Sequence, residues 1–266
     1  MDRLSKLAAI IIIILLCGTS YFTLNTTVSK LAQPNRDILI VGTSTPFPPF
    51  ETRAGDTVIG FDIDIAEKIS TKLNRRMIIK DFSDFDALLP SLKSGNLDMV
   101  IAGLSIYDAR KEVVDFSEPY YNSSQCVLTL QNGNLSNKVI FQPVDFDGLI
   151  VGYQTQTTSQ FWVEEKLINK TNIKKSVSFG NLQLGLDYLR MNVVDVIIID
   201  KPVADAFVHT NSNLKIIGTI ETKEQYAIAV QKDDPEGILS SVNIILSEMK
   251  ANGEYDKLIA KWFGGE

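Results

Sequence analysis

Short apolar runs alternate with segments of helical periodicity along most of this 266-residue chain. The runs at 38–41, 77–80 and 99–102 are typical of strands, and helical patterns lie between them at 62–73 and 85–92. The run at 99–102 is apolar at every position, as a strand covered on both faces would be. Strands that alternate with helices in this way indicate a mostly parallel α/β sheet.

The second half of the chain repeats the plan of the first half. The letters Leu-Ile-Val-Gly at 39–42 recur at 149–152, each time at the start of an expected strand. At one constant offset, Asp98 and the leucines before it correspond to Asp195 and the leucines before it. A chain of this length approaches the practical limit for a single core, so the repetition favours two lobes of similar build.

Two helical patterns at 238–249 and 255–262 follow an expected strand at 226–230. We expect this tail to return to the first lobe. The first lobe would then consist of residues 37–122 plus 227–266, and the second lobe of residues 123–226. The chain would cross between them twice, which makes a two-stranded hinge.

The amino terminus, residues 1–36, is typical of an export signal followed by a tether. Arg3 and Lys6 precede an apolar run from Leu7 to Leu16, which meets Cys17. The arrangement resembles a bacterial lipoprotein signal, in which Cys17 would carry the lipid, although such signals have a small residue where Leu16 stands. An uncleaved membrane anchor and simple secretion are the alternatives. All three place the remaining chain outside the cytoplasm.

Composition and motifs exclude several classes of function. A net charge of -6 argues against a protein that tracks nucleic-acid phosphates. One histidine and two cysteines leave almost no ligands for a zinc or iron-sulfur site, and Cys126 lies in an apolar run where a buried thiol is expected. Neither an HExxH pattern nor a glycine-rich phosphate loop occurs. We therefore expect no metal, no cofactor and no enzymatic activity.

Ligands of open α/β sheets lie beyond the carboxyl ends of the strands. If the two lobes face each other, four segments meet across the cleft, namely 43–50, 103–110, 154–158 and Asp200. Arg110 could bind a carboxylate bidentately, and Asp200 could accept hydrogen bonds from an ammonium group. Facing groups of opposite charge suit an α-amino acid zwitterion.

Each of these charged residues also has an ordinary interpretation. Arg110 could be a surface arginine at a helix start, and Asp200 could be the N-cap of the helix that follows it. Asp62 and Asp84 are likewise expected to cap the helices that begin beside them.

Six stretches carry a family likeness: TPFPPFE (45–51), GFDIDIAEKI (60–69), FDALLPSLKSGNLDMVIAGLSIYDARKEVVDFSEPYY (85–121), VGYQTQTT (151–158), DVIIIDKPVA (195–204) and GEYDKLIAKWFG (253–264). They resemble the polar amino-acid family of bacterial extracytoplasmic solute-binding proteins that feed ABC transporters. The resemblance covers residues 37–264. It implies the two-lobed type II periplasmic-binding fold, closure around one amino acid, and delivery to a permease with its ATPase. We expect a membrane-tethered monomer in the periplasm or on the cell surface.

The resemblance also implies roles for individual residues. The ligand's α-carboxylate would contact Arg110, Ser105, Gly103 and Thr157. The α-ammonium would contact Asp200, and the ligand side chain would lie between Phe47 and Phe85. Ser44 and Gln154 complete the expected binding set.

Four positions bear on the choice of ligand. Tyr107 stands where the family usually has threonine, and Gln156 where it usually has glycine. Ser44 occupies a position that is often aspartate in members taking histidine, lysine or glutamine, so the pocket has weaker reason to accept a cationic side chain. Gln154 could pair with an amide or a guanidinium. We expect a polar amino acid, with glutamine slightly ahead of arginine.

Two rivals remain at this point. The first is an enzyme on the same fold, similar to the secreted cyclohexadienyl or arogenate dehydratases, which would need a general acid in the cleft. The second is a ligand-sensing receptor protein that signals through a partner.

Overall fold

The computed structural model describes residues 37–140 and 142–264. The expected signal, the lipidation site Cys17 and the tether up to residue 36 lie outside the described residues. Within the described part of the chain, no helix combines the length and the apolar character needed to cross a bilayer.

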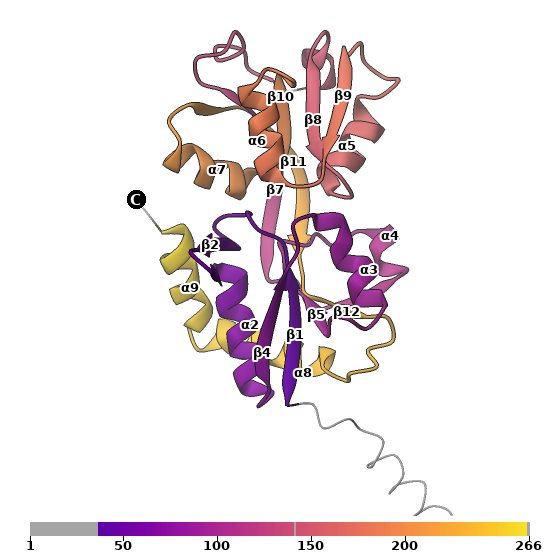
Figure 1. Ribbon diagram of the computed structural model, residues 1–266, viewed down its shortest axis with the longest axis vertical. Helices are drawn as coiled ribbons and strands as arrows, with labels where there is room; N and C mark the ends of the chain where they lie inside the picture. Colours follow the sequence, from indigo (N-terminus) through magenta and orange to yellow (C-terminus); the bar gives the residue numbers. More distant parts are fainter. Residues whose placement is uncertain (1–36, 141, 265–266) are drawn as a thin grey trace, which may run out of the picture. The chain divides into compact units, whose positions relative to one another are not determined.

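The first lobe is built on a five-stranded sheet with the order β4-β1-β5-β12-β6 (Figure 1). Strand β1 is parallel to β4 and β5, whereas β12 is antiparallel to β5 and β6. The strands are β1 (Ile38–Thr43), β4 (Arg76–Asp81), β5 (Met99–Val100), β6 (Val114–Phe116) and β12 (Ala229–Gln231), with a separate hairpin of β2 (Thr52–Ala54) and β3 (Thr57–Ile59). The helices are α2 (Phe61–Lys72), η1 (Phe85–Ala87), α3 (Leu88–Lys93), α4 (Asp108–Lys111), α8 (Leu239–Ala251) and α9 (Glu254–Phe263).

The second lobe has its own five-stranded sheet, with the order β11-β7-β10-β8-β9. Strand β8 is parallel to β9 and β10, and β7 is antiparallel to β10 and β11. The strands are β7 (Tyr121–Leu130), β8 (Ile150–Gln154), β9 (Lys175–Phe179), β10 (Val196–Asp200) and β11 (Leu214–Tyr226). The helices are η2 (Pro143–Phe146), α5 (Thr158–Lys166), α6 (Leu182–Arg190) and α7 (Lys201–Thr210). The α/β class and the two lobes agree with the expectation from the sequence. The expectation of mostly parallel sheets is wrong in detail, because two of the four strand pairings that the structure describes in each sheet are antiparallel, where β12 and β7 each join a parallel set of strands after the chain has crossed between the lobes.

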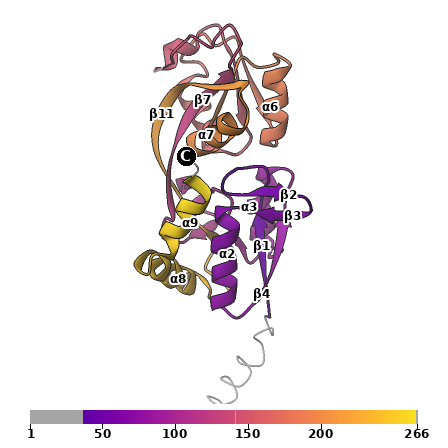
Figure 2. The same cartoon turned by 90° about the vertical axis from the view of Figure 1, so that its left-hand side faces the viewer.

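Two long strands, β7 and β11, connect the lobes side by side (Figures 1 and 2). Their paired register runs through Tyr121 and Tyr226, and Ser105 of lobe 1 forms an isolated bridge with Tyr226. The two-stranded hinge expected from the sequence is therefore present. The expected strand at 226–230 is wrong in detail, because β11 ends at Tyr226 and β12 begins only at Ala229.

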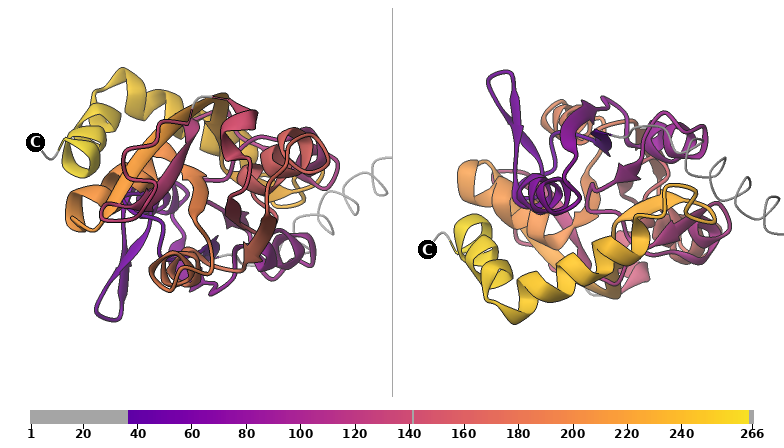
Figure 3. Two further views of the ribbon diagram at one scale, coloured as in Figure 1. Left: turned by 90° about the horizontal axis from the view of Figure 1, so that it is seen from above. Right: turned by 90° about the horizontal axis from the view of Figure 1, so that it is seen from below.

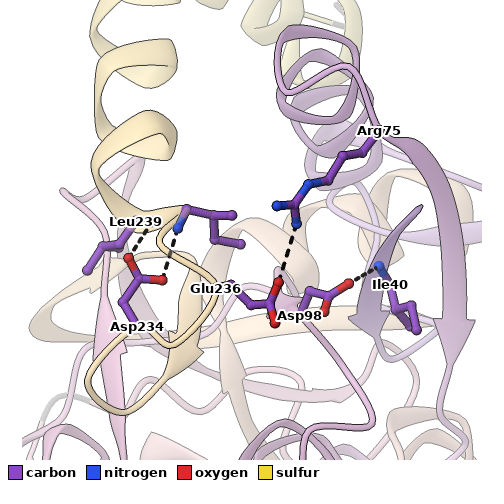
Figure 4. Close-up of polar contacts among 7 residues, drawn as sticks. Ile40, Arg75, Asp98, Asp234, Glu236 and Leu239 are labelled. Carbon is purple, nitrogen blue, oxygen red and sulfur yellow. Dashed lines mark hydrogen bonds and ion pairs between the residues drawn. The ribbon is translucent and has the colours of Figure 1, made fainter. Parts of the chain in front are cut away.

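The carboxyl-terminal helices α8 and α9 pack against α2 of lobe 1, as Figure 3 shows in yellow and indigo. Asp234 supports the start of α8, where its two carboxylate oxygens accept from the amides of Ile238 and Leu239 at 3.0 Å each (Figure 4). At the far end, the Trp262 indole donates to Asp64 of α2 at 2.7 Å. The tail thus completes the first lobe.

The internal repeat predicted from the sequence has a structural counterpart. In lobe 1, Asp98 accepts from the amide of Ile40 at 2.7 Å (Figure 4) and returns its own amide to the Ile40 carbonyl at 2.9 Å. In lobe 2, Asp195 makes the same two bonds with Ile150, also at 2.7 and 2.9 Å. Each aspartate therefore bonds the first half of one strand to the turn that leads into the neighbouring strand.

Two helix caps predicted from the sequence are not formed. Asp62 lies inside the first turn of α2, whose N-cap is Gly60, and its carboxylate bonds to groups outside the helix. Asp84 occupies the N-cap position of η1 without a capping bond from its side chain. Cys126 is buried and unpaired, as expected.

Candidate functional site

One cavity between the lobes is lined by all the predicted binding residues except Ser44. The lining residues are Phe47, Phe85, Gly103, Ser105, Arg110, Gln154, Thr157, Thr158 and Asp200. Its free space of about 20 Å³ is about what a single water molecule needs. An amino acid therefore enters only when the two walls move apart.

Arg110 is the cation of this cavity and only 6% of its surface is exposed. Its Nη1 donates to the carbonyl of Ser105 at 2.8 Å, and its Nη2 donates to the carbonyl of Gln156 in lobe 2 at 2.6 Å. The guanidinium carbon lies 5.6 Å from the ring centre of Phe85. Burial lowers the pKa of Arg110 to about 10, so the side chain stays charged near neutral pH. A guanidinium has five N–H groups, so those not used in these two bonds can bind an anionic group.

Asp200 is the anion on the opposite wall. It ends β10 and precedes α7, yet it makes no capping bond, because its Oδ1 accepts from the hydroxyl of Tyr226. Burial, followed by repulsion from Glu224, raises the pKa of Asp200 to about 7. A cationic group placed beside it would favour the ionised form.

Gly103 and Phe47 form a close contact on the lobe 1 side. A Cβ atom at Gly103 would lie 2.3 Å from Cε1 of Phe47, and the φ of +53° at Gly103 disfavours other residues independently. The Gly103 amide donates to Asp62 at 2.8 Å. The buried carboxyl group of Asp62 thus holds the backbone of Gly103 on the side away from the cavity.

Several polar groups of the cavity are already paired. The Ser105 hydroxyl donates to Glu224 at 2.7 Å, and the Thr157 hydroxyl donates to the Gln154 carbonyl at 2.7 Å. The Gln154 amide donates to the Gly180 carbonyl at 2.9 Å. Ser44 donates to the Phe82 carbonyl at 3.0 Å and does not line the cavity.

The two departures from the family pattern both lie at the junction of the lobes. Gln156 adopts a φ of +57°, in the left-handed region that favours glycine. Its backbone N–H donates to the side-chain Oε1 of Gln160 at 2.7 Å. The Tyr107 ring of lobe 1 stacks on Phe161 of α5, with centroids 4.6 Å apart and planes inclined by 20°. Gln156 therefore keeps the backbone shape of a glycine position, and Tyr107 adds an aromatic contact between the lobes.

Three residues around the site were missing from the predicted set. Thr158 is the last residue of the segment 154–158, which was predicted to face the cleft because it follows a strand, but Thr158 itself was not named as a binding residue. Tyr226 was expected only as the last residue of the second lobe, where the chain crosses between the lobes. Glu224 lies in a polar stretch of β11 that carries no motif. Among the described residues, no group of three potential metal ligands occurs.

Comparison with known proteins places the chain in a family. The sequence profile described as bacterial extracellular solute-binding proteins, family 3, matches residues 39–265. The arginine-binding extracellular protein ArtP of Bacillus subtilis is 27% identical over 260 residues, which is 97% of this chain and 98% of that protein.

Two solved structures of an ancestral arginine-binding protein, one bound to arginine and one to glutamine, are each 37% identical to this chain with a TM-score of 0.78. The first alignment covers 86% of this chain and 99% of the other, and the second 87% and 100%. These relatives are solute-binding proteins and not enzymes, and the chain belongs to the family 3 bacterial extracellular solute-binding proteins.

Proposed function

We propose that this protein binds one polar L-amino acid as a zwitterion and delivers it to the permease of an ABC importer. The observation that carries the proposal is the placement of Arg110 and Asp200, one from each lobe, in the lining of a single buried cavity. The α-carboxylate would bind the free N–H groups of Arg110, and the α-ammonium would bind Asp200. The relatives named for arginine and the neighbour solved with arginine or glutamine support an amino acid as the ligand class.

The remaining site residues have supporting roles in this proposal. Phe47 and Phe85 would flank the ligand side chain, while Gln154 and Thr157 shape the lobe 2 wall. Ser44 would act from outside the lining, through its bond to Phe82.

We further propose arginine ahead of glutamine. The order inferred from the sequence was the reverse, and it rested on the absence of an acid at Ser44. Around the cavity, however, the cation Arg110 is accompanied by two buried carboxyl groups, Asp200 and Glu224. A ligand that brings one extra positive charge would balance them, and buried charge is costly when unbalanced.

We propose the same domain limits as the sequence suggested, with changes of lobe at 122–123 and 226–227. The protein would act outside the cytoplasm as a monomer, tethered through a lipid on Cys17.

The proposal is tested by a thermal-shift screen over the twenty amino acids, followed by calorimetry. A ligand at 100 times its Kd should raise the stability by about 2.7 kcal/mol. Replacing Arg110 by alanine should cost about 3 to 5 kcal/mol of binding free energy, because it leaves a desolvated carboxylate unpaired.

The matched control is Lys111→Ala, which removes the same charge from the next, exposed position of α4. It should bind as the wild type does. Undiminished amino-acid binding by Arg110→Ala would remove this site from consideration.

A further inference from the structure

Glu224 is a buried carboxylate at the hinge whose four accepted hydrogen bonds come from neutral groups. Oε2 accepts from the hydroxyls of Ser105 and Thr158, each at 2.7 Å. Oε1 accepts from the Gln125 amide at 3.0 Å and from the Thr222 hydroxyl at 2.7 Å. Only 9% of the residue is exposed. The carboxylate is therefore held by neutral donors, and the Arg110 guanidinium interacts with it electrostatically without forming a direct hydrogen bond to it.

The partners of Glu224 come from both sides of the cleft. Ser105 belongs to lobe 1, Thr158 begins α5 of lobe 2, and Gln125 lies on the hinge strand β7. Ser105 and Thr158 also line the cavity. A single oxygen of Glu224 thus reaches a cavity-lining hydroxyl of each lobe.

A local irregularity of β11 accompanies this placement. The register between β11 and β7 shifts between Ile220 and Glu224, and Lys223 has a φ of +53°. Bulges of this kind re-aim a side chain at the cost of regular pairing. The pairing of β11 with β7 is therefore irregular where the Glu224 side chain turns toward the cleft.

The bonds to Glu224 determine how two hydroxyls face the ligand. A carboxylate can only accept hydrogen bonds, so the hydroxyl protons of Ser105 and Thr158 both point at Glu224. What each hydroxyl can still offer to the cavity is an acceptor lone pair. Together with Asp200, the cavity then presents a surplus of acceptors, and Arg110 provides the opposing donors.

We propose that Glu224 is a specificity-determining residue. Its carboxylate makes the cleft more negative and richer in hydrogen-bond acceptors, so that the cleft selects a cationic amino acid over a neutral one of the same shape. The inference rests on the function proposed above and deepens it. Glu224 affects the ligand in two ways. It orients the hydroxyls of Ser105 and Thr158, and its charge attracts a cation directly, since charges at a buried site are weakly screened.

The test compares L-arginine with L-citrulline, a neutral molecule of nearly the same shape, by calorimetry. The wild type should prefer arginine by about tenfold or more, because the extra positive charge of arginine is attracted by the buried carboxylate of Glu224. In Glu224→Gln this preference should shrink by about tenfold, with a smaller change in citrulline affinity.

The matched control is Glu221→Gln, the same charge change on an exposed residue of the same strand. It should leave both affinities unchanged. Thr158→Val is a second variant, and it should lower the preference for arginine in the same direction by a smaller factor, even if Glu224→Gln does not fold.

The outcomes separate this inference from the proposed function. A wild type that binds arginine and citrulline equally, or a Glu224→Gln variant that weakens both ligands by the same factor, overturns the role of Glu224 while amino-acid binding stands. A wild type that binds no amino acid removes the proposed function, and this inference with it.

Discussion

Replacing Asp200 by asparagine should remove the pH dependence of ligand binding. Asp200 has a pKa of about 7 in the unliganded cavity because it is buried and repelled by Glu224. The α-ammonium binds the ionised form, so the ligand has to displace the proton whenever the pH lies below that value. The affinity of the wild type should therefore rise with pH and level off above about pH 7.

The magnitude follows from the pKa. Each pH unit below about 7 should weaken binding about tenfold, or 1.4 kcal/mol, so binding at pH 5 should be about 100-fold weaker than the plateau value. Asp200→Asn should bind more weakly than the wild type above pH 7, by about 1.5 to 3 kcal/mol for the lost charged hydrogen bond. Its affinity should then stay nearly constant from pH 5 to 8.

Calorimetry at pH 5, 6, 7 and 8 measures this, and at pH 7 buffers of different ionisation enthalpy should reveal the release of about half a proton on binding. Asp62→Asn is the matched control, because burial raises the pKa of Asp62 to about 7 as well, although the residue lies behind Gly103 and outside the cavity lining. This control should keep the pH dependence. A wild-type Kd that does not change between pH 5 and 8 would refute the reasoning.

Two further predictions concern the contact between the lobes and the stability of the fold. Tyr107→Ala and Phe161→Ala should each speed ligand release, with a coupling of about 0.5 to 1.5 kcal/mol in a double-mutant cycle, since their stacked rings join the two lobes; zero coupling would show that the stack does not hold the closed form. The free energy of urea unfolding should fall as the pH rises from about 4 to 7, because the folded protein retains protons on the buried Asp62 and Asp200 up to about pH 7, and burial raises the pKa of Glu51 as well, whereas the unfolded chain loses these protons at about pH 4. Asp62→Asn should reduce the slope of that profile by the share that Asp62 contributes, and equal slopes in both proteins would contradict this account.

Much of the fold was available from the sequence because it depends on local patterns. The alternation of apolar runs and helical periods predicted both sheets, and the recurring Leu-Ile-Val-Gly letters with Asp98 and Asp195 predicted the repeat. Those aspartates make the same bonds to the first half of a strand in each lobe. A residue's position relative to the end of its strand is also local information, and it was enough to bring Arg110, Asp200 and Thr157 to one cavity.

The sequence alone did not determine how the polar groups of the cavity are paired. Asp62 has the sequence context of a helix cap, yet the folded chain aims it at Gly103 and Tyr120, which are distant in sequence. Ser44 follows a strand end as the other site residues do, but its hydroxyl is used by Phe82.

Glu224 shows the difference most clearly. Its neighbours along the chain are polar and exposed, so no periodicity marks it as buried. Only the pairing of β7 with β11, and the shift of register between Ile220 and Glu224, turn it toward Ser105 and Thr158. Strand ends are specified by residues that are near one another in sequence, whereas hydrogen-bond partners across a cleft are specified by the register of strands that are far apart. The sequence by itself therefore determined the two lobes and most of the cavity lining, and the tertiary structure decided which groups face a ligand as donors, acceptors or charges.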